Sequence, residues 1–226
     1  MEWVFLEETD STNRVAKELA RQGAPHGTAV LAKKQTAGRG RLGRNFFSPE
    51  GGLYLSVILR PQCPVEDRAL ITPMAAVAVH RVLMEDLGIV TRIKWVNDLY
   101  IGEKKLGGIL CEGCGDAVIV GIGLNLYTPE GGFPADIPAI ALDLMPCLVD
   151  VRELAADIRK YLLEPGPFLQ EYRSLCLTVG KTVTVHPVRG EPYEARALEI
   201  DHRCRLVVES RRGVETLDSG EVSVRF

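Results

Sequence analysis

The pattern of hydrophobic and polar positions predicts a chain that mixes helices and strands. A first helix is expected after a short strand, because cap-forming Asp10 and Ser11 precede apolar residues at helical spacing and Gly23 and Pro25 follow them. Short β-branched runs bounded by turn residues predict strands, and longer apolar stretches predict helices. The other expected elements are strands over 29–33, 52–59, 90–96, 105–112 and 118–126 and helices over 65–87, 151–163 and 168–176.

The last fifty residues show a different pattern. Short alternating stretches follow Gly180, and turns containing Gly190, Asp201 and Gly213 separate them. They predict a small β-barrel of the SH3-like kind. Two domains are therefore expected, 1–178 with a mixed sheet flanked by helices and 179–226 with the barrel, in an α+β fold. The strands expected in the second are 182–186, 193–200, 205–209, 214–217 and 222–225.

Composition places the chain among soluble globular proteins. It has 226 residues, 46% of them hydrophobic and 25% charged, with a formal net charge of -3. The acidic balance argues against general nucleic-acid binding. No apolar run approaches the roughly 20 residues that span a bilayer. The first eight residues lack the basic start of a signal peptide, so a cytoplasmic location and no membrane association are expected.

Six cysteines are scattered along the chain. Cys111 and Cys114 form a C-x-x-C motif, which in other contexts indicates redox chemistry or half of a zinc site. No second C-x-x-C and no histidine pair at ligand spacing accompany it, and it follows a strand rather than opening a helix. A structural role is the favoured interpretation.

The stretch 34–49 carries the most chemistry. Arg39, Arg41 and Arg44 stand among Gly38, Gly40 and Gly43. Glycines let a backbone lie close to a ligand with its N–H groups toward phosphate oxygens, and arginine adds permanently charged, paired donors. A segment so rich in glycine and like charge buries little apolar surface. We therefore expect residues 34–49, here called the glycine–arginine loop, to be mobile and to become ordered over an anionic ligand.

Gly38 to Gly43 also spells G-x-G-x-x-G, the dinucleotide-binding fingerprint. That motif requires a helix at its end to receive the pyrophosphate. The following residues, 45–52, contain a proline and two glycines and show no helical pattern. A Rossmann site is therefore disfavoured.

Taken together, the motifs resemble those of the biotin–protein ligases, enzymes with a class II aminoacyl-tRNA synthetase-like catalytic domain. The resemblance covers essentially the whole chain. The motifs that carry it are DSTN at 10–13, QTAGRGRLGR at 35–44, KWVNDLY at 94–100, KLGGILCE at 105–112, GIGLN at 121–125 and GEVSVR at 220–225.

Two positions depart from the family pattern. The family often has proline where this chain has Val96. It usually has an aromatic residue such as tryptophan after the last arginine of the loop, and Phe46 keeps a ring there. Members that also act as repressors carry a winged-helix domain before the DSTN motif. Because that motif begins here at Asp10, a ligase-only form without DNA binding is expected.

The resemblance implies ATP-dependent biotinylation in two half-reactions: formation of biotinyl-5′-adenylate, then transfer to a lysine of a biotin carboxyl carrier protein. Arg39, Lys105 and Asp98 are the expected catalytic residues, with Asp98 a candidate base for the transfer. Asn97 and Asp98 are expected to help hold Mg²⁺ on the ATP phosphates. The resemblance also implies a homodimer that forms through sheet edges.

The expected biotin-binding residues combine neutral polar groups, loop residues and glycines that leave room for the ring; they are Ser11, Thr12, Asn13, Gln35, Gly38, Arg39, Gly40, Arg41, Lys105, Gly108 and Gly121. The expected ATP- and adenylate-binding residues supply cations, one ring and amides; they are Arg39, Arg41, Arg44, Phe46, Lys94, Asn97 and Asn125.

Three alternatives stay open. A lipoate–protein ligase shares the broad fold and also forms an acyl-adenylate, but it would lack the glycine–arginine loop. A non-catalytic biotin-binding module would not need Lys105, Asn97 and Asp98. Nucleic-acid binding through the basic loop would call for interleaved aromatic residues, which the loop lacks.

Overall fold

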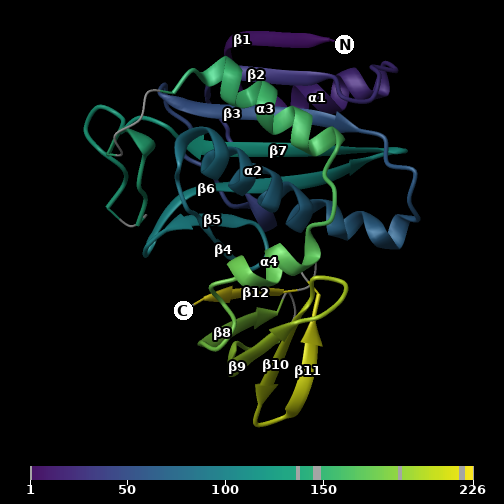
Figure 1. Ribbon diagram of the computed structural model, residues 1–226, viewed down its shortest axis with the longest axis vertical. Helices are drawn as coiled ribbons and strands as arrows, with labels where there is room; N and C mark the ends of the chain where they lie inside the picture. Colours follow the sequence, from purple (N-terminus) through teal and green to yellow (C-terminus); the bar gives the residue numbers. More distant parts are fainter. Residues whose placement is uncertain (1, 136–137, 145–148, 188–189, 219–221, 226) are drawn as a thin grey trace.

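The chain forms two sheets joined by helices. The computed structural model describes residues 2–135, 138–144, 149–187, 190–218 and 222–225, so Gly220 and Glu221 of the last motif lie outside the described residues. The first sheet has seven strands in the order β1-β2-β3-β7-β6-β5-β4 (Figure 1). Its strands are β1 (Trp3–Thr9), β2 (Ala29–Gln35), β3 (Gly52–Leu59), β4 (Arg92–Lys94), β5 (Asp98–Ile101), β6 (Lys104–Cys114) and β7 (Ala117–Asn125).

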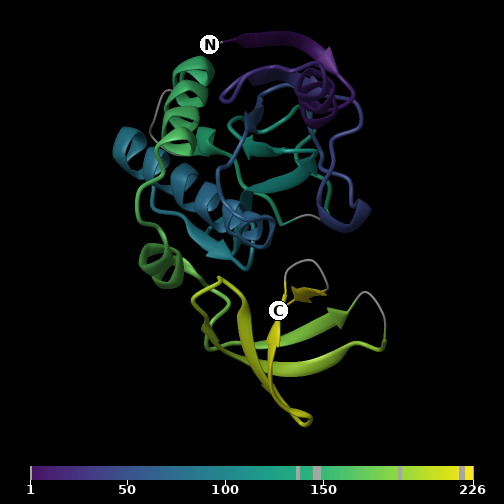
Figure 2. The ribbon, with the colours of Figure 1, turned by 90° about the vertical axis from the view of Figure 1, so that its right-hand side faces the viewer.

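Helices cover both faces of this sheet, which confirms the predicted mixed α+β architecture. Among the described strands, β1 and β2 run parallel and the other neighbours antiparallel. Helix α1 (Thr12–Arg21) lies on one face, and α2 (Ile71–Leu87) and α3 (Val151–Leu163) lie on the other (Figure 2). In the part of the chain described, no helix is both long and apolar enough to cross a membrane.

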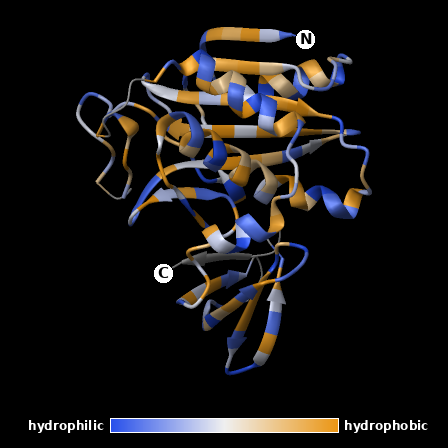
Figure 3. Cartoon of the chain, in the orientation of Figure 1, coloured by the Kyte–Doolittle hydropathy of each residue, from blue (hydrophilic) through white to orange (hydrophobic). Residues whose placement is uncertain are grey.

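Strand β3 contributes apolar side chains to the cores on both faces of the seven-stranded sheet. All eight of its residues are buried. Leu55 and Val57 belong to the large core shared with α2 and α3, whereas Ile58 belongs to the smaller core beneath α1. Ser56 interrupts this apolar run on the α1 side. Figure 3 shows the corresponding hydrophobic bands on the strands of the sheet.

The C-terminal residues form a five-stranded antiparallel sheet in the order β11-β10-β9-β8-β12. All five strands were predicted to within two residues at each end. Closure into an SH3-like barrel stays a prediction, because β11 and β12 are the outer strands of the sheet. The strand bounds are β8 (Thr182–Pro187), β9 (Tyr193–Ile200), β10 (Leu206–Ser210), β11 (Gly213–Leu217) and β12 (Val222–Arg225).

The predicted helix over 65–87 begins later than expected. Val65–Leu70 is a 3-10 helix, and α2 starts at Ile71. Pro73 is the reason: it has no N–H and is tolerated only in the first turn of a helix, so the helix cannot extend far before it. The expected helix 168–176 is the shorter α4 (Leu169–Leu175).

The predicted strand 90–96 is also shorter. Strand β4 ends at Lys94, because the backbone N–H of Trp95 donates to the Thr178 hydroxyl at 3.0 Å instead of joining a strand ladder. The C-x-x-C motif lies at the end of β6, and both of its cysteines are free. Burial raises the pKa of Cys111 to about 12, which leaves an inert thiol and supports the structural interpretation.

Candidate active site

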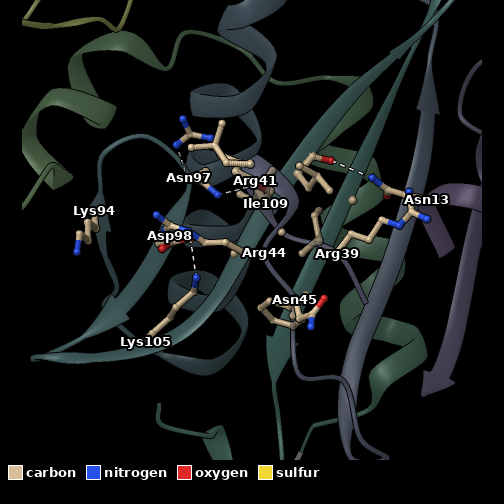
Figure 4. Close-up of a pocket in the computed structure, with 18 of the residues that line it drawn as sticks. Asn13, Arg39, Arg41, Arg44, Asn45, Lys94, Asn97, Asp98, Lys105 and Ile109 are labelled. Carbon is tan, nitrogen blue, oxygen red and sulfur yellow. Dashed lines mark hydrogen bonds and ion pairs between the residues drawn. The ribbon is translucent and has the colours of Figure 1, made fainter. Parts of the chain in front are cut away.

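A cavity of about 470 Å³ opens where the start of α1, the glycine–arginine loop, the turn between β4 and β5, and the middle of β6 and β7 meet. All predicted site residues line it except Gly38 and Asn125. Figure 4 shows side chains from these separate segments converging on one space. Segments about a hundred positions apart in the sequence are thus brought together by the sheet order.

Neutral polar groups gather at the start of α1. Gln35 at the end of β2 accepts hydrogen bonds from the Thr12 backbone N–H at 2.9 Å and from the Thr12 hydroxyl at 3.2 Å. The Gln35 amide nitrogen donates to the Ser48 hydroxyl at 3.0 Å. Ser11, the N-cap residue of α1, is buried and also lines the cavity. This side offers uncharged donors and acceptors.

The opposite side of the cavity is charged. Lys105 Nζ lies 2.8 Å from the Asp98 carboxylate, and both side chains are about three-quarters buried. Arg41 donates to the Asn97 side-chain oxygen at 3.1 Å, and the Asn97 amide nitrogen donates to the Ile109 carbonyl at 2.8 Å. Burial lowers the pKa of the Arg41 guanidinium, although the negative charge of Asp98 acts against this shift. Lys105 and Arg41 therefore already contact oxygen atoms of the protein, and each can exchange these for the oxygen atoms of a ligand.

The glycine–arginine loop is a narrow hairpin that contains a 3-10 turn (Arg41–Gly43) and no α-helix, as expected for a site that is not a Rossmann motif. Arg39 forms an antiparallel bridge with Asn45, and the Gly40 N–H donates to the Arg44 carbonyl at 2.7 Å. Arg39 and Arg44 are exposed at its surface. The loop is well placed to cover a ligand.

Phe46 connects this loop to the floor of the cavity. Its ring lies against Gly123 of β7, where an added Cβ would come within 2.5 Å of the ring, and the Lys105 ammonium is 5.9 Å from the ring centroid. The ring predicted at this position is therefore packed beside a predicted catalytic lysine. Lys94 at the end of β4 and Gly108 of β6 line the same cavity.

Gly38 and Asn125 are not among the residues that line the cavity. An added Cβ on Gly38 would lie 2.3 Å from the Ser48 hydroxyl, so this glycine is required for the loop to pack against its own return segment. Asn125 donates to the carbonyls of Lys105 and Ile140 at 3.4 and 3.2 Å. Its amide fastens the segment after β7 to the start of β6. The predicted contact of Asn125 with the nucleotide stays a prediction.

Several lining residues were not predicted as site residues. Tyr100, Asn45 and Pro138 border the cavity, and the buried side chain of Trp95 forms part of its wall. Burial, with a smaller contribution from Asp98, raises the pKa of Tyr100 to about 12, so it remains a neutral phenol. Tyr100 follows Asp98 by two residues in a strand, which puts both side chains on one face; that spacing was the available signal.

The described residues hold no group of three or more His, Cys, Asp or Glu side chains that could enclose a metal ion. Of the described residues that line the cavity, Asp98 is the acidic one, and the Asn97 side-chain oxygen accepts from Arg41. This donor set fits a Mg²⁺ ion held mainly by substrate phosphates and water with one carboxylate, rather than a protein cage.

A family profile described as "Biotin/lipoate A/B protein ligase family" matches residues 5–125. The chain belongs to this family. It is 35% identical to the bifunctional ligase/repressor BirA of Bacillus subtilis (strain 168) over 98% of this chain and 73% of that protein. It is 30% identical to the biotin--[acetyl-CoA-carboxylase] ligase of Mycobacterium tuberculosis, over 95% of this chain and 86% of that protein.

The solved structures of the family agree with the sequence comparison. A biotin protein ligase from Aquifex aeolicus in complex with biotin and ATP is 29% identical to this chain and superimposes with a TM-score of 0.84. The match covers 99% of this chain and 98% of that one, including both sheets. The family fold thus extends through the C-terminal sheet, beyond the residues that the family profile matches.

Proposed function

We propose that this chain is an ATP-dependent biotin–protein ligase that forms biotinyl-5′-adenylate and then transfers biotin to a lysine of a biotin carboxyl carrier protein. One observation carries the proposal: a single cavity joins a neutral polar side at α1 to a cationic side at Lys105 and the glycine–arginine loop. Biotin has a neutral ureido head and an anionic tail, and ATP is an anion. Membership of the family and the similarity to ligases of biotin support this assignment.

In the first half-reaction an oxygen of the biotin carboxylate forms a bond to the α-phosphorus of ATP, and the bond to the pyrophosphate oxygen breaks. The carboxylate is already ionised at neutral pH, so no base is needed. The difficulty is the approach of two anions, which preorganised cations and N–H groups relieve. Lys105, Arg39, Arg41 and the loop amides supply these groups, while Arg44, Lys94 and Asn97 lie where they can hold phosphate.

In the second half-reaction the lysine amine of the carrier attacks the carbonyl carbon of the mixed anhydride, and AMP leaves. That lysine is an ammonium at neutral pH, so it must lose a proton before its nitrogen can attack. Asp98 is our candidate base, because it is the carboxylate among the described residues that line the cavity. It pairs with Lys105, so it must exchange that partner. When closed over the adenylate, the glycine–arginine loop would exclude water and so protect the mixed anhydride from hydrolysis.

Mg²⁺ fits the site as an ion carried by the ATP phosphates, where it would neutralise charge on the oxygens. Asp98 would hold it, and Asn97 would do so only after releasing Arg41.

We further infer the setting of the enzyme. The acceptor is a carboxylase carrier domain, by analogy with the relatives named acetyl-CoA-carboxylase ligases. Residues 1–178 would form the catalytic domain and 179–226 a small SH3-like domain. A homodimer, a cytoplasmic location and the absence of DNA binding complete the proposal; the net charge of -3 supports the last point.

The test is pyrophosphate release from ATP and Mg²⁺, with biotin and with lipoate offered separately. Release with biotin alone is expected. Release with lipoate alone would reassign the substrate within the same family, whose profile covers both ligands. Biotin binding without pyrophosphate release would instead identify a non-catalytic module.

A further inference from the structure

In the turn between β4 and β5, the side chain of Asn97 takes the place of its own backbone N–H. The register of β5 and β6, which pairs Asp98 with Gly108, puts Asn97 opposite Ile109. Hydrogen-bonded residues of an antiparallel pair exchange two N–H···O=C bonds. The Ile109 N–H donates to the Asn97 carbonyl at 3.0 Å, but the Ile109 carbonyl accepts from the Asn97 side-chain amide at 2.8 Å. The backbone N–H of Asn97 is therefore displaced from the ladder.

This displaced N–H has no hydrogen-bond acceptor among the residues that the structure describes. A buried backbone N–H without an acceptor is rare in folded proteins, because its desolvation is costly. Asn97 is only partly buried, and it lines the cavity of the candidate active site. Its N–H is thus available to a molecule that binds in the cavity.

The neighbouring carbonyl shows which way the N–H points. The Val96 carbonyl accepts from the Tyr172 hydroxyl at 3.1 Å, and both residues are buried in the core. The peptide bond between Val96 and Asn97 is trans, so its C=O and its N–H point in opposite directions. Because the carbonyl points toward α4, the Asn97 N–H points away from that helix and from the core around it.

The Asn97 side chain is fully used in holding this arrangement. Its nitrogen donates to the Ile109 carbonyl, and its oxygen accepts from Arg41 at 3.1 Å (Figure 4). An amide side chain has both a donor and an acceptor, as the backbone does, so it can replace the backbone N–H and still bind Arg41. A side chain without a donor would leave the Ile109 carbonyl to the backbone N–H.

The surroundings of the N–H suit a phosphate. Arg41, Arg44 and Lys94 line the same cavity, and Arg41 contacts Asn97 itself. A backbone N–H that is already fixed in position can stabilise negative charge without the cost of reorganisation. It also adds a directed hydrogen bond to the attraction of the cations.

We propose that the backbone N–H of Asn97 donates a hydrogen bond to a phosphate oxygen of ATP, and that the Asn97 side chain keeps this N–H available by occupying the Ile109 carbonyl. This inference rests on the proposed function, in which ATP is the phosphate ligand. Asn97 thereby binds the nucleotide through its main chain, while its side chain acts as a positioning group. The contact does not require Asn97 to release Arg41.

The test changes one group of the backbone. The chain is made by cell-free synthesis with the α-hydroxy acid analogue of asparagine at position 97, which keeps the side chain and replaces the N–H by an ester oxygen. We expect the dissociation constant for ATP with Mg²⁺ to rise about tenfold or more, as for loss of a hydrogen bond to a charged group. The dissociation constant for biotin should not change. The reference is the chain made in the same way with asparagine.

Tyr172→Phe is the matched control, because an ester also weakens the carbonyl on its other side as an acceptor. This variant removes the donor to the Val96 carbonyl and leaves the Asn97 N–H in place. It should weaken ATP binding less than the ester does. A loss in Tyr172→Phe as large as that in the ester chain would assign the effect to the carbonyl contact and overturn the proposal.

ATP binding separates this inference from the proposed function. A wild-type chain that binds ATP but releases no pyrophosphate with biotin would refute the ligase assignment. The ATP affinities of the ester chain and its reference, measured with and without saturating biotin, would still decide the role of the N–H. Equal ATP affinities, or an equal weakening of biotin binding, would overturn the inference.

Discussion

Lys105 is the residue whose substitution tests the proposed chemistry most directly. Its ammonium is 2.8 Å from Asp98, and its side chain retains 26% of its exposure. At an effective dielectric constant of about 20, a unit-charge pair at that distance attracts by about 6 kcal/mol, since 332/(20 × 2.8) ≈ 6. A substrate oxygen must take the place of Asp98, so only part of this energy is available to the reaction.

We therefore expect Lys105→Met to slow adenylation by about 10²–10³-fold, the cost of removing one preorganised donor, or about 2.7–4 kcal/mol. The assay is single-turnover pyrophosphate release with saturating biotin and ATP. Lys104→Met is the matched control, because Lys104 is the neighbouring residue of β6, is exposed and does not line the cavity. A Lys105→Met rate close to wild type, or equal losses in both variants, would refute the electrostatic role.

Three further predictions concern the loop, the transfer step and the sheet. Arg39→Ala should release the adenylate prematurely, as measured by the half-life of the isolated complex; retention as long as in wild type would contradict a gating role. Asp98→Asn should slow transfer from pre-formed adenylate by about 10²–10⁴-fold, the usual contribution of a general base, and a wild-type rate would remove Asp98 from that role. Gly107→Ala should lower the free energy of unfolding by about 1–3 kcal/mol or more through overpacking, because its Cβ would lie 2.2 Å from the Gly123 carbonyl oxygen. Gly113→Ala, in the same strand with nothing within 4 Å, should be neutral in urea unfolding, and similar losses in both would contradict the packing argument.

Much of the fold could be predicted because its signals are local. The apolar run of β3 and the alternating strands after Gly180 show their structure within a few residues. The start of α2 was missed although Pro73 carried the information, because the apolar periodicity was given more weight than the position of one proline. The end of β4 could not be found in this way, since it depends on Thr178, more than eighty positions away.

In the candidate site, too, local sequence patterns could be read, whereas contacts between distant segments could not. The glycine–arginine loop and the resemblance to the ligases identified the residues that face the cavity. Polar contacts behind them were not found, because the Glu112 carboxylate accepts from the Asn13 amide of α1, about a hundred positions away in the sequence. For Asn125 the structure adds a contact that the motif did not indicate: its amide donates to the backbone carbonyl of Lys105, while its contact with the nucleotide stays a prediction.

The turn that holds Asn97 has a consequence for the order in which the enzyme becomes active during its synthesis. The Trp95 indole N–H donates to the Cys204 carbonyl at 3.0 Å, and the Tyr172 hydroxyl donates to the Val96 carbonyl at 3.1 Å. A chain that has emerged from the ribosome only as far as β7 contains the biotin-facing residues but lacks both of these supports. We therefore expect the nascent chain to remain unable to activate biotin until the C-terminal sheet has been made and has docked, so that no reactive adenylate forms on an unfinished enzyme.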